Sequence, residues 1–254
     1  MAELNVRGLK IGAGRPKTIV PVMGADAAAL TAEVEAAVAA GADCIEWRAD
    51  FLAGLCEPER LEHAARAVRT AADETPVLFT IRTASQGAAL ELAPAPYAEL
   101  LRSAIGTGDI DLVDIECDKG DDLIRELIEC AREHRVATVV SFHNFDRTPA
   151  TDELIATLAH ARELGADIPK MAVMPQSKQD TLRLLAATDE VTRVRGISPV
   201  ITMAMGADGA VSRLLGEEYG SAMTFSSVEG ASAPGQIDLA HTKAALEALH
   251  QALS

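Results

Sequence analysis

A single lysine, Lys170, interrupts an otherwise apolar stretch that runs from Ile168 to Pro175. A lysine is rarely fully buried without a compensating partner. Desolvation disfavours the charged form of a buried amine, which leaves the amine available as a nucleophile. Lys170 could therefore form a Schiff base with a ketone or an aldehyde. The structural alternative is a lysine at a strand end, with its stem on the core and its amine in water.

Other charged or titratable side chains stand at the ends of the apolar runs that precede this lysine. Residues two apart in a strand share one face, so Glu46 and Arg48 would point the same way. Each residue has a structural explanation of its own. Glu46 could form a salt bridge with Arg48, and His143 could be an ordinary histidine at a strand terminus. The whole set at strand ends is Glu46, Arg48, Arg82, Asp114, Glu116 and His143.

These residue types suit proton transfer next to a carbonyl group. An imine on Lys170 would withdraw electrons and acidify protons on the adjacent carbon, and His143 could remove such a proton and later return one to a leaving hydroxide. Arginines bind carboxylates through two parallel hydrogen bonds, so we expect an anionic substrate. The same cations would help to keep a neighbouring lysine neutral. Glu46, Ser232 and Gln236 suit a polyhydroxylated ring.

The elements that must position these residues follow a repeat of about 25–30 residues, the size of one strand–helix unit. Long apolar strands are typical of a parallel sheet that is covered on both faces. The expected strands are 17–23, 43–48, 76–82, 112–116, 136–143, 167–174, 199–205 and 221–226. The helices that follow them are expected at 27–40, 58–72, 95–106, 121–134, 150–164, 177–189, 209–217 and 237–251.

This alternation predicts an α/β fold, a (β/α)8 TIM barrel that forms one catalytic domain over residues 1–254. Two short strands within residues 1–16 predict a β-hairpin that caps the barrel bottom. A doubly wound open sheet would usually carry G-x-G-x-x-G after its first strand, and the residues after 17–23 do not match that pattern. In a barrel, the active site gathers at the carboxyl ends of the strands, where Lys170 and His143 would be neighbours.

Charge and composition exclude several classes of partner. The chain has 254 residues, a formal net charge of -15 and 3% aromatic residues. Nucleic acids and anionic membranes need a basic face, so neither is an expected partner. No apolar run approaches the length of a membrane span, and four cysteines without C-x-x-C spacing favour a cytoplasmic location. No histidine pair has metal-ligand spacing, so we expect no metal site.

Five stretches of the chain resemble the type I 3-dehydroquinate dehydratases. They are EWRAD at 46–50, FTIR at 79–82, SFHNF at 141–145, DIPKMAVMP at 167–175 and ASAPGQI at 231–237. Together they extend over nearly the whole chain. The resemblance implies the dehydration of 3-dehydroquinate to 3-dehydroshikimate in the shikimate pathway, which leads to chorismate and aromatic amino acids. It leaves open whether the enzyme is biosynthetic or serves quinate breakdown.

The resemblance also implies roles for individual residues. Lys170 is similar to the lysine that forms an imine with the ring ketone, and His143 to the general base and acid of a syn elimination through an enamine. Arg213 is similar to the arginine that binds the substrate carboxylate. The remaining predicted binding residues are Glu46, Arg48, Arg82, Ser232 and Gln236 for the hydroxyls, and Met203, Met205 and Phe225 for the apolar wall. The family uses no metal or organic cofactor and is typically homodimeric.

Two positions depart from the family pattern. Gln86 stands where many members have glutamate, near the catalytic histidine, and an amide can hydrogen-bond but cannot carry charge. Pro21 replaces a frequent serine and has no hydroxyl or backbone donor. The segment 226–236 reads as irregular and predicts a lid. Two alternative functions are a class I aldolase and a catalytically silent barrel that binds a quinate-like ligand.

Overall fold

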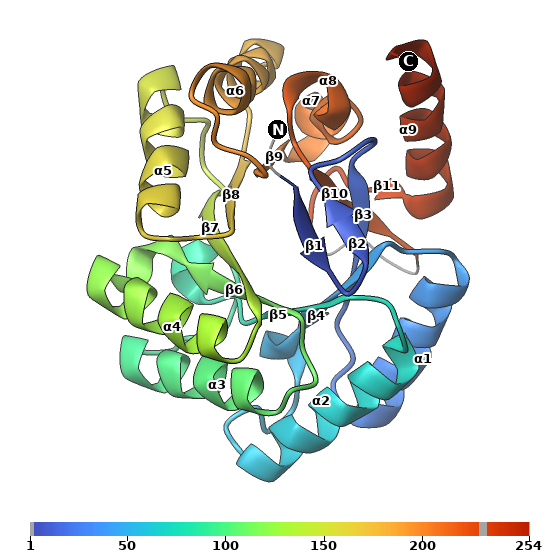
Figure 1. The fold of residues 1–254 in the computed structure, drawn as a ribbon, viewed down its shortest axis with the longest axis vertical. Helices are drawn as coiled ribbons and strands as arrows, with labels where there is room; N and C mark the ends of the chain where they lie inside the picture. Colours follow the sequence, from blue (N-terminus) through green and yellow to red (C-terminus); the bar gives the residue numbers. More distant parts are fainter. Residues whose placement is uncertain (1–2, 229–232, 254) are drawn as a thin grey trace.

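The computed structural model describes residues 3–228 and 233–253, which form an α/β TIM-barrel-like fold (Figure 1). The strands of the barrel wall are parallel and pair in the order β10–β3–β4–β5–β6–β7–β8–β9. An isolated parallel bridge between Val200 and Ser221 joins the β9 and β10 ends. The predicted barrel is thereby confirmed. The bounds are β3 Lys17–Val22, β4 Cys44–Arg48, β5 Val77–Thr80, β6 Leu112–Glu116, β7 Ala137–Asn144, β8 Ile168–Val173, β9 Ile201–Ala204 and β10 Met223–Ser227.

Helices lie around the outside of this barrel wall (Figure 1). The long ones are α1 Ala27–Ala39, α2 Pro58–Ala72, α3 Pro94–Gly106, α4 Asp121–Glu133, α5 Thr151–Glu163, α6 Lys178–Asp189 and α9 Leu239–Leu253. Short turns of helix are η1 Ala49–Phe51, η2 Ala84–Gln86, η3 Cys117–Lys119 and the π-helical η4 Glu190–Val194. Asp26 caps α1 by accepting from Ala29 N–H at 2.9 Å, and Gly41 follows it at φ +85°, so both predicted ends are confirmed.

The single helix predicted over 209–217 is wrong. The structure has three short pieces there, α7 Gly206–Gly209, η5 Ala210–Arg213 and α8 Gly216–Tyr219. The Ser212 hydroxyl bonds the backbone of Ala204 and Gly209, which ties this segment to the end of β9. Local backbone bonds to a side chain compete with helix continuation.

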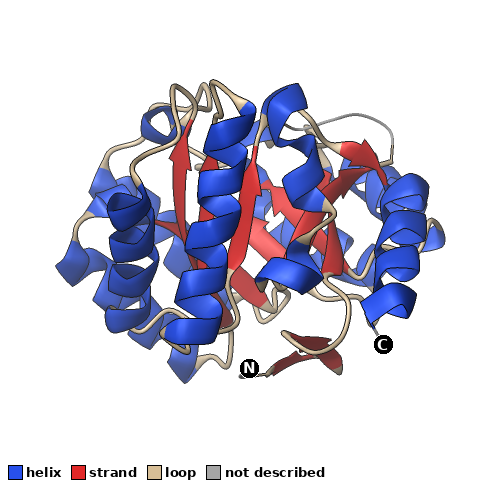
Figure 2. Cartoon of the chain, turned by 90° about the horizontal axis from the view of Figure 1, so that it is seen from above, coloured by secondary structure: helices blue, strands red, loops and turns tan. Residues whose placement is uncertain are grey.

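An N-terminal hairpin covers the bottom of the barrel, as predicted. Strands β1 (Leu4–Val6) and β2 (Leu9–Ile11) pair antiparallel, and the hairpin lies below the barrel wall in Figure 2. Val6 and Ile11 pack against the first inward-facing side chains of the barrel strands. The short strand β11 (Ile237–Asp238) adds to β10 beyond the lid segment.

Alternation along each strand separates an outer core from the barrel interior. On β4, Ile45 and Trp47 pack outward against the helices, whereas Cys44 lies with the inward cluster. The inward layer nearest the bottom takes one apolar residue from each strand of the wall: Ile19, Cys44, Leu78, Leu112, Val139, Ile168, Ile201 and Met223. Two residues further along, the same strands present Glu46, Thr80, Asp114, Ser141, Lys170, Met203 and Phe225.

A buried apolar layer therefore lies below a mostly polar layer of side chains at the carboxyl ends of the strands. This period of two explains why the chemistry-bearing residues stand in EWR, IPK and SFH patterns. Among the described residues, no helix has both the length and the apolar character required to cross a bilayer.

Candidate active site

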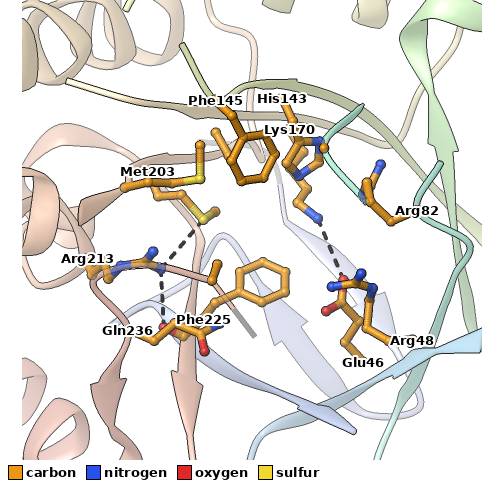
Figure 3. A pocket seen from close by; sticks show the side chains of 14 residues that line it. Glu46, Arg48, Arg82, His143, Phe145, Lys170, Met203, Arg213, Phe225 and Gln236 are labelled. Carbon is orange, nitrogen blue, oxygen red and sulfur yellow. Dashed lines mark hydrogen bonds and ion pairs between the residues drawn. The ribbon is translucent and has the colours of Figure 1, made fainter. Parts of the chain in front are cut away.

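Lys170 lies inside the barrel on β8, and its residue surface is only 4% exposed. Its Nζ donates a hydrogen bond to Oδ2 of Asp114 at 3.1 Å and lies 3.8 Å from Oε1 of Glu46. The ring of Phe225 is 4.6 Å from Nζ (Figure 3). The charged groups in contact with Lys170 are therefore two carboxylates, whereas the sequence analysis had expected arginines nearby. These contacts must open before the amine can attack a carbonyl.

His143 lies on the neighbouring strand β7, where Ser141 is paired in register with Lys170 and His143 stands two residues further along. Its backbone N–H donates to Oε1 of Gln86 at 2.7 Å, and its ring Nδ1 lies 3.0 Å from the same oxygen. Because an amide oxygen only accepts, Nδ1 must carry the hydrogen. Gln86 thereby sets the tautomer that leaves Nε2 of His143 free to accept a proton.

The surroundings of His143 favour its neutral form. Dense packing lowers the pKa of His143 well below its usual 6.5, and the positive charges of Arg82, Lys170 and Arg48 lower this pKa further. The ring of Phe145 stacks at a centroid distance of 6.4 Å and an interplanar angle of 15°. At neutral pH the imidazole is uncharged, which is the state that a general base requires.

A buried ion network lies beside these two residues. Arg82 meets Oδ1 of Asp114 at 2.9 Å and Oε1 of Glu116 at 3.1 Å, and it donates to the hydroxyl of Ser141 at 3.0 Å. Burial alone would lower the pKa of Arg82, but the two carboxylates raise it. Burial alone would raise the pKa of Asp114, but Arg82 and Lys170 hold it below its usual value. Arg82 and Asp114 therefore remain charged together.

Arg213 reaches the opposite side of the pocket from η5 and is 2% exposed. It donates to the carbonyl of Pro234 at 3.1 Å and to the carbonyl of Phe225 at 3.5 Å, and its Nε has no hydrogen-bond partner among the described residues. No carboxylate of residues 3–228 or 233–253 pairs with it, and burial lowers the pKa of Arg213 to about 10. A buried guanidinium with no carboxylate partner among the described residues has the chemistry to bind an anion, and this role of Arg213 stays a prediction.

Arg48 has a partner of its own at the rim. Its guanidinium binds the carboxylate of Asp50 through two hydrogen bonds of 2.8 and 2.7 Å, and it lies 5.1 Å from the ring of Phe51. The salt bridge with Glu46 that the sequence allowed does not form. Asp50 also accepts from the backbone N–H of Arg82 at 3.2 Å, so one carboxylate orients two neighbouring loops.

One pocket collects nearly all of the residues singled out from the sequence (Figure 3). Its lining is Glu46, Arg48, Arg82, Gly87, His143, Phe145, Lys170, Ala172, Met203, Met205, Arg213, Phe225, Ala233 and Gln236. Gln86 is buried behind His143 and does not line it, and Ser232 lies outside the described residues. Among the described residues, no three His, Cys, Asp or Glu side chains are grouped to hold a metal ion. The individual roles in binding stay predictions.

Sequence reasoning missed three features of this pocket. Asp114 had been noted only as a strand-end carboxylate, without the bond that it forms with Lys170. Phe145 stood in the SFHNF stretch without an assigned role. Gly87 (φ +89°) approaches Phe145 so closely that a Cβ there would overlap the ring. A glycine in a short loop carries no sequence signal for such a contact.

Part of the segment predicted as a lid, residues 229–232, lies outside the described residues. Its described end is attached to the site, since the carbonyl of Pro234 accepts from Arg213 and from the N–H of Gly206 at 3.1 Å. Closure over a substrate stays a prediction.

Comparisons with known proteins agree on one family. The model of the type I 3-dehydroquinase family matches residues 18–253. The 3-dehydroquinate dehydratase of Salmonella typhimurium is 43% identical over 252 residues, which cover 99% of this chain and 100% of that protein. The type I 3-dehydroquinate dehydratase of Clostridium difficile, solved with covalently modified comenic acid, superposes with a TM-score of 0.96 at 36% identity and 99% coverage of both chains. The 3-dehydroquinate dehydratase of Geobacillus kaustophilus gives 0.95 at 40% identity, covering 98% of this chain and 97% of that one.

Proposed function

The chain belongs to the type I 3-dehydroquinase family, and from that membership we propose that it is a hydro-lyase of the shikimate pathway that dehydrates 3-dehydroquinate to 3-dehydroshikimate. The observation that carries the chemical part of the proposal is the position of Lys170. It is a buried amine that lines the same pocket as His143 and as Arg213, which has no carboxylate partner among the described residues. The mechanism that we propose follows from these three groups.

The first step of substrate binding is the attraction between the negative substrate and a positive side chain. The substrate carboxylate pairs with Arg213, which has no carboxylate partner in the described structure. The ring then extends across the pocket toward Lys170, with its hydroxyls near Glu46, Arg48, Arg82 and Gln236. The side chains of Met203 and Phe225 border its apolar edge. Binding at Arg213 thus holds the ketone close to the amine.

Lys170 attacks the ketone as a free amine. The amine is released when the Lys170 ammonium gives one proton to His143, and a C–N bond then forms to the ketone carbon. The carbonyl oxygen takes one proton from the nitrogen and one back from His143 and leaves as water, so that a cationic iminium with one N–H remains on the ring. Asp114 and Glu46, which pair with Lys170 in the free protein, then face this cation. The same two carboxylates are adjacent to positive charge before and after imine formation, so little electrostatic reorganisation is needed.

His143 performs the elimination. Its neutral Nε2 removes a proton from the carbon next to the iminium, and the electron pair forms an enamine. The imidazolium then returns that proton to the hydroxyl on the following carbon, the C–O bond breaks, and water leaves from the same face. Hydrolysis of the conjugated iminium consumes one water and restores Lys170. The balance is the loss of one water from the substrate. A histidine with a lowered pKa is a strong acid once protonated, which suits the hydroxide-expelling step.

Borohydride trapping tests this function. The protein is incubated with 3-dehydroquinate and borohydride, and the modified peptide is located by mass spectrometry while enone absorbance is followed in an untreated sample. We expect an adduct on Lys170, enone in the untreated sample, and neither with Lys170→Met. Lys178→Met, which removes an exposed lysine at the start of α6, is the matched control and should behave like the wild type.

Absence of the adduct on Lys170 would refute the imine mechanism, and absence of enone would refute the dehydratase function. A class I aldolase would form an adduct with its own substrate but would give no enone from 3-dehydroquinate.

We also propose, from the family resemblance, a homodimer in the cytoplasm. Sedimentation at equilibrium should give twice the mass of one chain.

A further inference from the structure

A row of alternating buried charges connects the pocket with a lysine outside it. Lys170 pairs with Asp114 at 3.1 Å, Asp114 with Arg82 at 2.9 Å, and Arg82 with Glu116 at 3.1 Å. The second oxygen of Glu116 pairs with Lys119 at 2.8 Å. Asp114 and Glu116 are fully buried, so each needs the cations on both of its sides. Lys119 is the terminal cation of this row, and it does not line the pocket.

Lys119 holds the loop that follows β5 through two of its hydrogen bonds. Its side chain is 6% exposed and emerges from η3, directly after β6. Nζ donates to the hydroxyl of Thr83 at 2.9 Å and to the hydroxyl of Ser85 at 3.0 Å, in addition to the ion pair with Glu116. It also lies 5.3 Å from the centre of the Tyr97 ring. The exposed carboxylate of Asp118 is a further, longer contact of Nζ at 3.3 Å.

The loop that Lys119 holds is the one that carries Gln86. Thr83 is fixed by Glu116, which accepts its N–H at 2.8 Å and its hydroxyl at 2.5 Å. The carbonyl of Thr83 in turn accepts the N–H of Gln86 at 3.0 Å. Gln86 then meets both the backbone and the ring of His143. An unbroken series of bonds therefore runs from Lys119 to the imidazole.

We propose that Lys119 is a positioning residue for the dehydration, which acts on His143 through Thr83 and Gln86 and on Lys170 through Glu116, Arg82 and Asp114. The inference rests on the proposed function. Without this cation, Glu116 would be left with Arg82 alone, and Arg82 would be drawn away from Asp114. The loop would also lose the bonds that hold Gln86 against the histidine. Misplacement of a catalytic group by about 1 Å can reduce turnover about 100-fold.

Kinetics of Lys119→Met test the proposal. Methionine keeps the length and removes the charge, and we expect kcat to fall about 10- to 100-fold. We also expect the acid limb of the kcat–pH profile to move to higher pH, because a loosened loop admits water to His143. Lys119→Arg, which restores the charge, should recover most of kcat. Lys178→Met is the matched control, since this exposed lysine contacts none of these groups, and should keep the wild-type kcat and profile.

A double-mutant cycle separates positioning from general damage. If Lys119 acts through Gln86, then Lys119→Met should reduce kcat much less in a Gln86→Ala background than in the wild type. Should Lys119→Met fail to fold, Thr83→Val is the decisive variant, because it keeps the shape of the side chain, removes the hydroxyl that links Lys119 and Glu116 to the loop, and leaves the Lys119–Glu116 ion pair in place. It should lower kcat and shift the profile in the same direction.

Three results would overturn the proposal: a folded Lys119→Met with wild-type kcat and profile, full additivity with Gln86→Ala, or a folded Thr83→Val that behaves as wild type. The wild-type protein serves as the internal reference for the function itself. If it forms no enone and no borohydride adduct, the proposed function fails, whereas the proposal for Lys119 fails only against an active wild type.

Discussion

Gln86→Glu would place a negative charge against His143 with almost no change in the shape of the side chain at position 86. The amide oxygen of Gln86 already accepts from Nδ1 of His143 at 3.0 Å, and a carboxylate oxygen can make the same bond. The pKa of His143 is depressed in the present protein by packing and by three neighbouring cations. The substitution therefore adds the one feature that this environment lacks, which is an anion at hydrogen-bond distance.

The size of the effect follows from the geometry. Two unit charges about 4 Å apart interact by ~4 kcal/mol at an effective dielectric constant of about 20. That energy corresponds to ~3 pKa units, at about 1.36 kcal/mol for each unit. Desolvation of the new carboxylate offsets part of this energy, so we expect the pKa of His143 to rise by about 1–3 units. Because only neutral imidazole accepts a proton, the acid limb of the kcat–pH profile should move to higher pH.

Steady-state kinetics between acidic and alkaline pH, together with an NMR titration of the His143 ring, measure this shift directly. Gln251→Glu on α9 is the control, because it adds the same charge at an exposed position far from the pocket. We expect its profile to coincide with that of the wild type. If Gln86→Glu also left the profile and the titration unchanged, the assignment of Gln86 as the group that tunes His143 would be refuted.

Three further predictions follow from the same geometry. Arg213→Met should raise KM for the substrate about 10- to 100-fold, because a charged hydrogen bond to the substrate is lost. The thermal midpoint of the free protein should not fall, because the substitution removes a buried charge that has no carboxylate partner among the described residues. A lower midpoint with an unchanged KM would contradict this prediction. Gly87→Ala should lower kcat by displacing Phe145 from His143, whereas Gly108→Ala, with a similar positive φ but open space around its Cβ, should alter stability only; kinetics and thermal melts distinguish the two. Finally, His143 takes up a proton near pH 6.5 in the unfolded chain but only at lower pH in the folded protein, so the free energy of unfolding should decrease as pH falls below 6.5. The thermal midpoint of His143→Asn should decrease less than that of the wild type over the same range.

The fold was largely predictable because its signals are local. Apolar runs such as Val136–Val140 and helical patterns between them repeat at a constant spacing, and caps such as Asp26 and Gly41 mark helix ends. Where the signal failed, over 209–217, a hydroxyl bonded back to the β9 end and interrupted the helix. That competition depends on the approach of β9, which no local pattern encodes.

The sequence predicted which residues form the candidate site better than it predicted which of them contact one another. Side chains of a strand alternate between its two faces, so every second residue points the same way. Once one face of a strand is assigned to the interior, Glu46, Asp114 and Lys170 are assigned with it. The family motifs added Arg213 and Gln86, which lie in loops and carry no periodic signal.

Only the tertiary structure decided which charges meet. With 23 lysines and arginines and 38 aspartates and glutamates, the sequence cannot choose partners. The register between β6, β7 and β8 brings Asp114 to Lys170 and Ser141 to Arg82, and the loop after β5 brings Gln86 to His143. Within residues 3–228 and 233–253, no carboxylate is brought to Arg213. Residue types are fixed along the chain, but the interaction energy of charges depends on distances across the barrel, and those distances exist only once its strands are in register.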